Sequence, residues 1–342
     1  MKKLSIKYKK FLNRRNKTEI SKKRNRKTKK YNNNIVQNKS IPPRGTTFED
    51  EYAPRDLMLQ YESVEKVLKY ISIIKNKGIQ GKNLSIRLEN VNNIGEGAIA
   101  MLLSVINELS QSGILIKGTK PLNQKAKSIL EKSGFFKHIR GSIDSENMNS
   151  KNIIIRTGDN NTSQQELAPE IIKAMETVWG EKARCPLLFG GIGEMLRNSC
   201  DHAFNNKENI TWHIGLSHIE EENTVKFSFV DNGEGIITRY NQKGLITKVI
   251  SYFKNDAEIL ENAFKSGIES RTGLPWRGLG LPTIFELYTD KIITNLVVIT
   301  NHVFLDFDKN IAEKLQNGFS GTYYFWKINK SCAKSYFQLS KN

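Results

Sequence analysis

Apolar residues recur along the first half of the chain with the spacing of helices and strands in turn. Apolar side chains three and four positions apart predict amphipathic helices, whereas alternate apolar and polar positions predict half-buried strands. The elements predicted in this half are a helix over 57–74 that ends near Gly78, a strand over 84–91, a helix over 97–109, a strand over 114–117 and a helix over 122–132. Because strands alternate with helices, we expect a small α/β domain with parallel strand pairing.

The second half shows the same two patterns, and polar residues interrupt them at specific places. The elements predicted there are a helix over 188–204, a strand over 225–230, a helix over 257–266 and a strand over 320–326. The first of these helices has a largely apolar stripe that would face a core, formed by Ile192, Met195, Leu196, Ser199 and Ala203. We expect a second α/β domain in this half.

Composition marks the ends of these two domains. Pro42-Pro43-Arg44-Gly45 punctuates the chain, so we assign residues 1–45 to a tail and linker. The boundaries that we expect beyond it are a first domain over 46–157, a second domain over 158–330 and a C-terminal tail over 331–342.

Most of the formal net charge of +18 lies in the tail. The chain has 53 Lys and Arg against 35 Asp and Glu, and residues 1–40 hold 16 basic side chains and one acid, which leaves a balance of +3 for the remainder. Such a segment cannot bury enough apolar surface to offset its ordering entropy, so we expect disorder. It is suited to contact a polyanion such as DNA, RNA or the ribosome, although a solubilising extension has the same composition.

Other features exclude several classes of protein. The three cysteines, Cys185, Cys200 and Cys332, have no Cys-x-x-Cys spacing, which argues against a disulfide scaffold and a cysteine-rich zinc module. No apolar run approaches the ~20 residues of a membrane-spanning helix. The basic N-terminus also lacks the apolar segment of a secretory signal. We therefore expect no membrane span and a reducing, cytoplasmic location.

The helix predicted over 188–204 carries three polar residues on one face. Glu194, Asn198 and Asp201 are spaced i, i+4 and i+7, so they share that face. Asn can offer a neutral oxygen to Mg²⁺, and Glu can polarise a water molecule for attack on phosphorus. A solvated helix face has the same spacing, so the helix alone leaves both interpretations open.

Two glycine-rich segments follow this helix. The strand over 225–230 runs into Asp231, with Gly233, Gly235 and Ile236 after it. Alternate glycines let the backbone approach a flat ligand closely, and Asp231 can accept a hydrogen bond from an exocyclic amine. A second glycine loop opens a helix, where free N–H groups suit phosphates. Its residues are Arg277, Gly278, Leu279, Gly280 and Leu281.

In this order, the three segments resemble the N, G1 and G2 motifs of the GHKL superfamily, which includes gyrase-type ATPases, sensor histidine kinases and anti-sigma kinases. The resemblance covers roughly residues 165–328 and implies a Bergerat α/β sandwich with a mixed sheet that binds ATP and Mg²⁺. It implies that Glu194 is the general base, that Asn198 is the magnesium ligand and that Asp231 is the adenine anchor. Residues 236–277 would form the ATP lid. The other residues that it places at the nucleotide are Asp201, Gly233, Gly235, Ile236, Arg277, Gly278, Leu279, Gly280, Leu281 and Thr322, of which Thr322 would support Asp231 from the last strand.

Residues 84–139 resemble the STAS domain of anti-sigma-factor antagonists. The resemblance lies in a strand, the turn from Val91 to Gly97, a long helix, a second strand and a Leu-Glu-Lys-Ser-Gly-Phe ending. The serine that this family phosphorylates has no counterpart here, because the matching stretch reads Gly95-Glu96-Gly97-Ala98. A generic βαβα module remains the alternative. The resemblance implies a scaffold, dimerisation or protein-binding role for this domain.

The leading hypothesis is an ATP-binding and ATP-hydrolysing regulatory protein, in which closure of the lid changes how domains or partners meet. The stretch from Glu194 to His202 resembles anti-sigma serine kinases more than gyrases, so the first alternative is a Ser/Thr protein kinase that acts on a STAS-type partner. The second alternative is an adaptor that senses nucleotide without turnover. A homodimer also remains open, because GHKL proteins often dimerise.

The uneven charge distribution generates a prediction about residues 1–40. Deleting them should leave ATP binding unchanged and weaken only the salt-sensitive association with DNA or RNA, because counterion release by the tail favours that association. Binding of nucleotide and of nucleic acid by the full chain and the truncated chain, at low and high salt, checks this. Weaker ATP binding by the truncated chain would show that the tail belongs to the nucleotide site.

Overall fold

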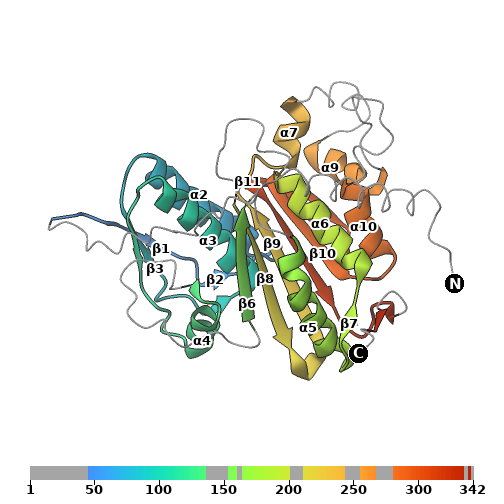
Figure 1. Cartoon of the computed structure of the whole chain (residues 1–342). Coiled ribbons are helices and arrows are strands. Elements are labelled where there is room, and N and C mark those ends of the chain that lie inside the picture. The colour runs from blue at the N-terminus through green and yellow to red at the C-terminus, as the bar shows by residue number, and fades with distance from the viewer. Residues whose placement is uncertain are drawn as a thin grey trace, which may run out of the picture.

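The computed structural model describes residues 45–135, 153–159, 164–200, 211–242, 255–266, 280–334 and 338–339. Over these residues the chain is a mixed α/β structure with one three-stranded and one five-stranded sheet. The predicted tail, Gly45 apart, lies outside the described residues. Figure 1 shows the order of the layers: the three-stranded sheet, helices α2 (Val64–Ile79) and α3 (Glu96–Gln111), the five-stranded sheet, and a second layer of helices.

The three-stranded sheet lies entirely in the first half of the chain. Its strands β1 (Glu49–Tyr52), β3 (Leu84–Arg87) and β5 (Ile116–Gly118) have the order β1-β3-β5 and pair in parallel. Helices α2 and α3 connect them, as parallel pairing requires, and α4 (Gln124–Lys132) follows β5. The predicted parallel α/β arrangement is therefore confirmed. The sequence pattern missed β1 because this strand reads Glu-Asp-Glu-Tyr and has no apolar alternation.

Helix α2 begins at Val64, and the prediction that it begins at Leu57 is wrong. Leu57 lies in β2 (Asp56–Leu57), which pairs in parallel with β4 (Asn93–Ile94). The carbonyl of Leu57 accepts a hydrogen bond from the N–H of Gly95, which fixes the extended backbone. Leu57 is fully buried in this position, so its apolar side chain fits the helical spacing without being helical.

The five-stranded sheet is built by the second half and has the order β10-β11-β9-β8-β6. Every neighbouring pair in it is antiparallel, so the expectation of a mixed sheet is wrong for the described residues. The physical reason is that two of the pairs are hairpins, whose short turns permit only antiparallel pairing. The strands are β6 (Ile153–Asp159), β8 (Thr211–Ile219), β9 (Thr224–Asp231), β10 (Thr294–Asp306) and β11 (Ile311–Ile328).

One expected boundary falls inside a paired strand, and another separates a paired strand from the second half. Strand β6 pairs with β8 along its whole length, so a boundary after residue 157 would divide a strand of the second sheet. Near the C-terminus, β12 (Gln338–Leu339) pairs with β7 (Ala183–Arg184), which ties part of the predicted tail to the second half.

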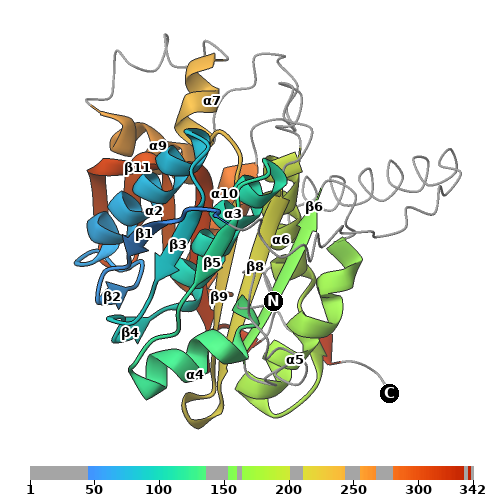
Figure 2. The same cartoon turned by 90° about the vertical axis from the view of Figure 1, so that its left-hand side faces the viewer.

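Side chains of the five-stranded sheet alternate between two cores. On β9, Phe229 packs in one core and Val230 in the other, and on β11 Tyr324 and Tyr323 divide in the same way. The first core is completed by α5 (Ala168–Trp179), α6 (Pro186–Cys200), α9 (Asp256–Ser266) and α10 (Gly280–Thr289). The second is completed by α2 and α3, seen in front of the sheet in Figure 2. The two halves of the chain thus share a hydrophobic core.

The predicted helices of the second half are confirmed in α6 and α9, and α10 begins at Gly280 in the second glycine loop. The sequence analysis did not identify α5, β6, β8 or β10 as separate elements. None of the helices in the described ranges combines the length and the apolar character that a membrane crossing needs.

Helix α3 approaches the sheet closely at its first turn. Gly97 faces the ring of Tyr323, and a Cβ atom at position 97 would overlap that ring and its hydroxyl oxygen. Tyr323 is buried and cannot move aside without disturbing the shared core. A glycine that lowers helix propensity is therefore used here for packing.

We predict that Gly97→Ala lowers the free energy of unfolding by about 1–3 kcal/mol, because overpacking outweighs the gain in helix propensity. Urea denaturation measures the change. Adding Tyr323→Phe removes one of the overlapping atoms and should restore part of the loss, which a double-mutant cycle detects. A Gly97→Ala protein at least as stable as the wild type would contradict the close approach.

Candidate functional site

Helix α6 carries two of the predicted site residues near its C-terminal end. Glu194 is buried, with 5% of its surface exposed, and Asn198 is half-buried one turn later. Gly280, the first residue of α10, lies against both: a Cβ atom there would stand 3.2 Å from Asn198 Oδ1 and 3.4 Å from Glu194 Oε2. The structure therefore brings the start of the second glycine loop's helix onto the Glu–Asn face of α6.

Helices α6 and α10 pack closely at Gly191 of α6. A Cβ atom on Gly191 of α6 would overlap the side chain of Leu287 on α10, so the two helices pack more closely there than a larger residue would allow. This contact keeps the N-terminus of α10 beside Glu194 and Asn198.

Arg197 is a charged neighbour of this face that the sequence analysis did not single out. Its Nη2 atom lies 3.0 Å from Oε1 of Glu194, three residues earlier on the same helix. A buried carboxylate needs such compensation, so the ion pair explains how Glu194 is tolerated on α6. The i, i+3 spacing in the sequence is the signal that could have indicated it.

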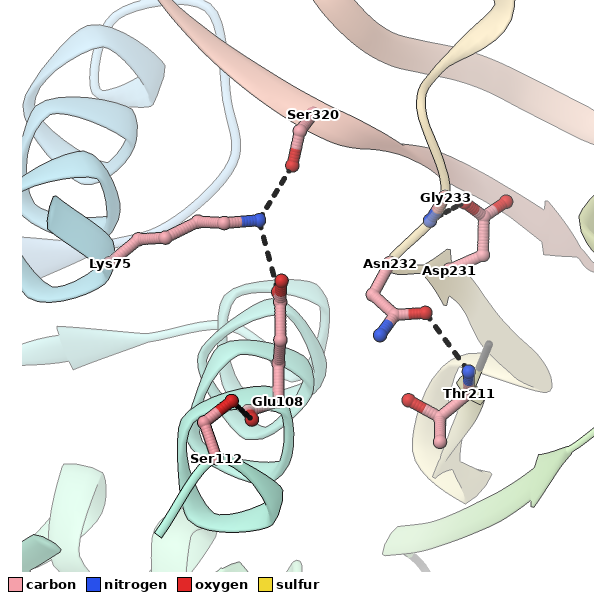
Figure 3. A network of polar contacts seen from close by, with 8 residues as sticks. All are labelled: Lys75, Glu108, Ser112, Thr211, Asp231, Asn232, Gly233 and Ser320. Carbon is pink, nitrogen blue, oxygen red and sulfur yellow. Dashed lines mark hydrogen bonds and ion pairs between the residues drawn. The ribbon is translucent and has the colours of Figure 1, made fainter. Parts of the chain in front are cut away.

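Asp231 ends strand β9 and is buried, with 5% of its surface exposed. Its Oδ1 atom accepts hydrogen bonds from the N–H groups of Gly233 at 2.9 Å and Thr322 at 3.1 Å, and Oδ2 accepts one from the hydroxyl of Ser199 at 2.9 Å. Figure 3 shows the bond to Gly233. Burial raises the pKa of the Asp231 carboxyl above its ordinary value, and these three hydrogen bonds oppose the rise only in part.

Strand β11 contacts Asp231 from the neighbouring position in the sheet. Thr322 is the residue paired with Asp231 across β9 and β11, and its main-chain N–H holds the carboxylate. Gly321 precedes it, and a Cβ atom there would overlap the main-chain carbonyl of Asp231. The Thr322 hydroxyl lies 3.5 Å from that of Thr300 on β10, so three strands converge at this point.

Ser199 joins the two parts of the site. It follows Asn198 on α6, donates to Asp231 and lies 3.0 Å from the carbonyl oxygen of Met195. The sequence analysis assigned Ser199 to an apolar stripe, and it does face the sheet, but as a hydrogen-bonding partner. A hydroxyl on the core-facing side of the helix was the available signal.

The loop after Asp231 is held at both ends. The side-chain carbonyl of Asn232 accepts from the N–H of Thr211 at 2.9 Å (Figure 3). Gly235 has φ of +80°, a conformation that favours glycine. The N–H of Ile236 then donates to the hydroxyl of Thr300 at 2.9 Å.

Helices of the first half reach the same end of β11. Lys75 of α2 donates to Glu108 of α3 at 3.0 Å and to the hydroxyl of Ser320 at 2.9 Å, two residues before Thr322 (Figure 3). Glu65, at the start of α2, accepts from the N–H groups of Gln316 and Asn317 in β11. The strand that supports Asp231 is therefore also bonded to the first half.

The remaining predicted residues divide into two groups. Ile236 and Leu281 are buried in the hydrophobic core, at 8% and 5% exposure, and stabilise the loop and the helix that follow the glycines. The residues that lie outside the described part of the chain are Asp201, Arg277, Gly278 and Leu279.

Comparison with protein-family models and with curated proteins finds no match for this chain. Within the described ranges, no three His, Cys, Asp or Glu side chains gather as a metal site.

The site has two polar parts with different chemistry: the carboxylate of Asp231, and the pair formed by Glu194 and Asn198 on α6. Oδ1 of Asp231 uses both acceptor positions on main-chain donors, whereas Oδ2 accepts one hydrogen bond among the described residues, which leave its second acceptor position unused. Glu194 and Asn198 offer a carboxylate and a neutral amide oxygen beside the N-terminus of α10. Ser199 connects these two parts, because it follows Asn198 on α6 and donates a hydrogen bond to Asp231.

The raised pKa of Asp231 generates a prediction about stability. A carboxyl group whose pKa is higher in the folded protein stabilises the fold at low pH, and that contribution is lost as the pH rises through the folded-state pKa. Asp231→Asn should therefore raise the free energy of unfolding of the nucleotide-free protein by on the order of 1 kcal/mol at neutral pH. The gain should shrink as the solution becomes acidic.

Urea denaturation at several pH values measures the effect. Glu221→Gln is the control, because Glu221 is exposed in the β8–β9 turn and its replacement should change stability little. A loss of stability in Asp231→Asn at neutral pH would contradict the assigned cost of ionising this group.

Proposed function

We propose that this chain is an ATP-binding and ATP-hydrolysing regulatory protein of the GHKL type, with a STAS-like unit in its first half. The observation that carries the proposal is the buried carboxylate of Asp231, held by neutral donors from β11, α6 and the glycine loop. A buried acid without a basic partner among these donors suits recognition of an amine, as on adenine, more than it suits stability.

The adenine base would be bound at Asp231. The acceptor position of Oδ2 that no described residue uses matches an exocyclic amino group. A Cβ atom on Gly233 would stand 3.0 Å from Oδ1 of Asp231, so a glycine at this position lets the loop approach the carboxylate closely. The close backbone around Gly233 and Gly321 favours a flat ligand over a bulky one.

The phosphates and Mg²⁺ would lie beside Glu194 and Asn198, on the same C-terminal part of α6 that carries Ser199. Asn198 would supply a neutral oxygen ligand to the ion, which suits its preference for hard oxygen donors. Glu194 would orient and deprotonate the attacking water. Mg²⁺ supplies charge neutralisation when it is bound with ATP. Gly280 sets main chain rather than a side chain close against these two groups. A carboxylate and a neutral amide oxygen beside a helix N-terminus are groups that fit Mg²⁺ and phosphate.

The first half would act as the regulatory partner of the nucleotide site. Its helices α2 and α3 cover one face of the five-stranded sheet, and Lys75 of α2 bonds to β11 near Thr322. A STAS-like unit fused in this way would sense changes at the site through that strand, and its own protein partner would meet the outer side of the unit, which faces the viewer in Figure 2.

The proposal is tested with γ-labelled ATP, Mg²⁺ and the full chain, comparing wild type with Glu194→Gln. We expect Glu194→Gln to bind ATP with nearly unchanged affinity and to release phosphate at least ~10²-fold more slowly, since it keeps the shape of the side chain but lacks the base. Glu220→Ala, an exposed substitution in the β8–β9 turn, is the control and should match the wild type.

Other outcomes would select the alternatives. Transfer of label to an added STAS-type protein would identify a kinase, and ATP binding without turnover would identify a sensor. No ATP binding by the wild type would refute the proposal.

A further inference from the structure

Strand β10 is interrupted by an irregular residue beside the candidate site. Thr300 pairs with Thr322, but Asn301 pairs with Phe319, and the register shifts on both sides of Asn301. Asn301 has φ of +52°, which only a minority of residues adopt and which Asn tolerates better than most. The irregularity turns the Asn301 side chain toward the loop that follows Asp231.

The Asn301 amide uses all four of its hydrogen-bonding positions on that loop. Its Nδ2 atom donates to the carbonyl of Glu234 at 2.9 Å and to the hydroxyl of Thr238 at 2.7 Å. Its Oδ1 atom accepts from the N–H groups of Ile237 at 2.9 Å and Thr238 at 3.2 Å. An Asn side chain has two donors and two acceptor positions, so none is left for other partners.

These bonds replace the usual cap of a helix. Helix α7 (Ile236–Gln242) follows Gly235, which has no side chain to cap the first N–H groups. Thr300 accepts from Ile236, and Asn301 accepts from Ile237 and Thr238, so two residues of a distant strand cap the helix together. Figure 1 shows α7 above the upper end of the sheet.

Gly235 is required by the same arrangement. A Cβ atom on Gly235 would overlap the Asn301 amide, and the φ of +80° at Gly235 also disfavours other residues. The glycine spacing of the loop, which the sequence assigned to ligand approach, is thus needed at this position for contact with Asn301.

Thr300 extends the connection to the other side of Asp231. Its hydroxyl lies 3.1 Å from the carbonyl oxygen of Gly321, next to the residue whose N–H holds the carboxylate. The loop and the strand that surround Asp231 are therefore both bonded to β10. Thr300 is fully buried, so water cannot easily replace these bonds.

We propose that Thr300 and Asn301 are positioning residues, which hold the loop from Gly233 to Thr238 in the conformation that receives the base and fix the start of α7. This role rests on the proposed function, since it assigns to the two residues the placement of the same ligand. They act through the loop and do not touch the reacting atoms.

The test uses Asn301→Gly in the full chain, because glycine accepts the positive φ and removes only the amide. We expect hydrogen exchange at the N–H groups of Ile237 and Thr238 to accelerate about tenfold, while exchange within β8 and β9 stays unchanged. Thr300→Val should accelerate exchange at Ile236 instead. Asn310→Gly is the matched control, since Asn310 has φ of +53° in the same hairpin but is exposed at its turn.

ATP affinity is measured in the same variants, and Asn301→Gly should weaken it about tenfold. Unchanged exchange at 237 and 238, or equal acceleration throughout the sheet, would overturn the positioning role. Local acceleration with undiminished ATP affinity would overturn it as well. If the wild type binds no ATP, the proposed function fails by itself, and the exchange pattern still decides whether Thr300 and Asn301 hold the loop.

Discussion

The burial of the five-stranded sheet on both faces is the constraint on which the rest of the structure depends. A sheet covered on two sides needs apolar side chains at successive positions, and the run from Leu296 to Ile299 on β10 serves both cores in turn. Helices α2 and α3 are therefore part of the same folding unit as the candidate site. Because β9 lies in the middle of the sheet, the residue that ends it, Asp231, is also withdrawn from water.

The polar groups at that end of the sheet carry a cost that packing does not explain. Asp231 is a carboxylate held by three neutral donors, and burial raises its pKa. Thr300, which is fully buried, and Asn301, which is half-buried, form a second polar network with the loop that follows Asp231. Buried polar groups are costly unless their hydrogen bonds are satisfied, so these networks agree with the proposed ligand site better than with a purely structural role.

The sequence predicted the parts whose local pattern agrees with their environment. Helices α3, α6 and α9 were expected near their observed positions, and the three motif residues Glu194, Asn198 and Gly280 do converge. It failed where an interaction between distant segments decides the outcome. Leu57 has helical spacing but is held in β2 by Gly95, and Ser199 fits an apolar stripe but bonds to Asp231. Nothing near Asn301 in the sequence indicates that it caps a helix that begins 65 residues earlier.

By itself the sequence determined the alternation of helices and strands, the concentration of positive charge in the first 40 residues and the order of an acid–amide helix and two glycine loops. These are local properties, set by side-chain period, charge and backbone freedom within a few residues. Only the tertiary structure decided that the sheet is antiparallel, that α2 and α3 cover it, and that Asp231 is held from three directions. Strand direction, shared cores and hydrogen bonds between distant segments depend on which surfaces meet, and a one-dimensional pattern does not specify that.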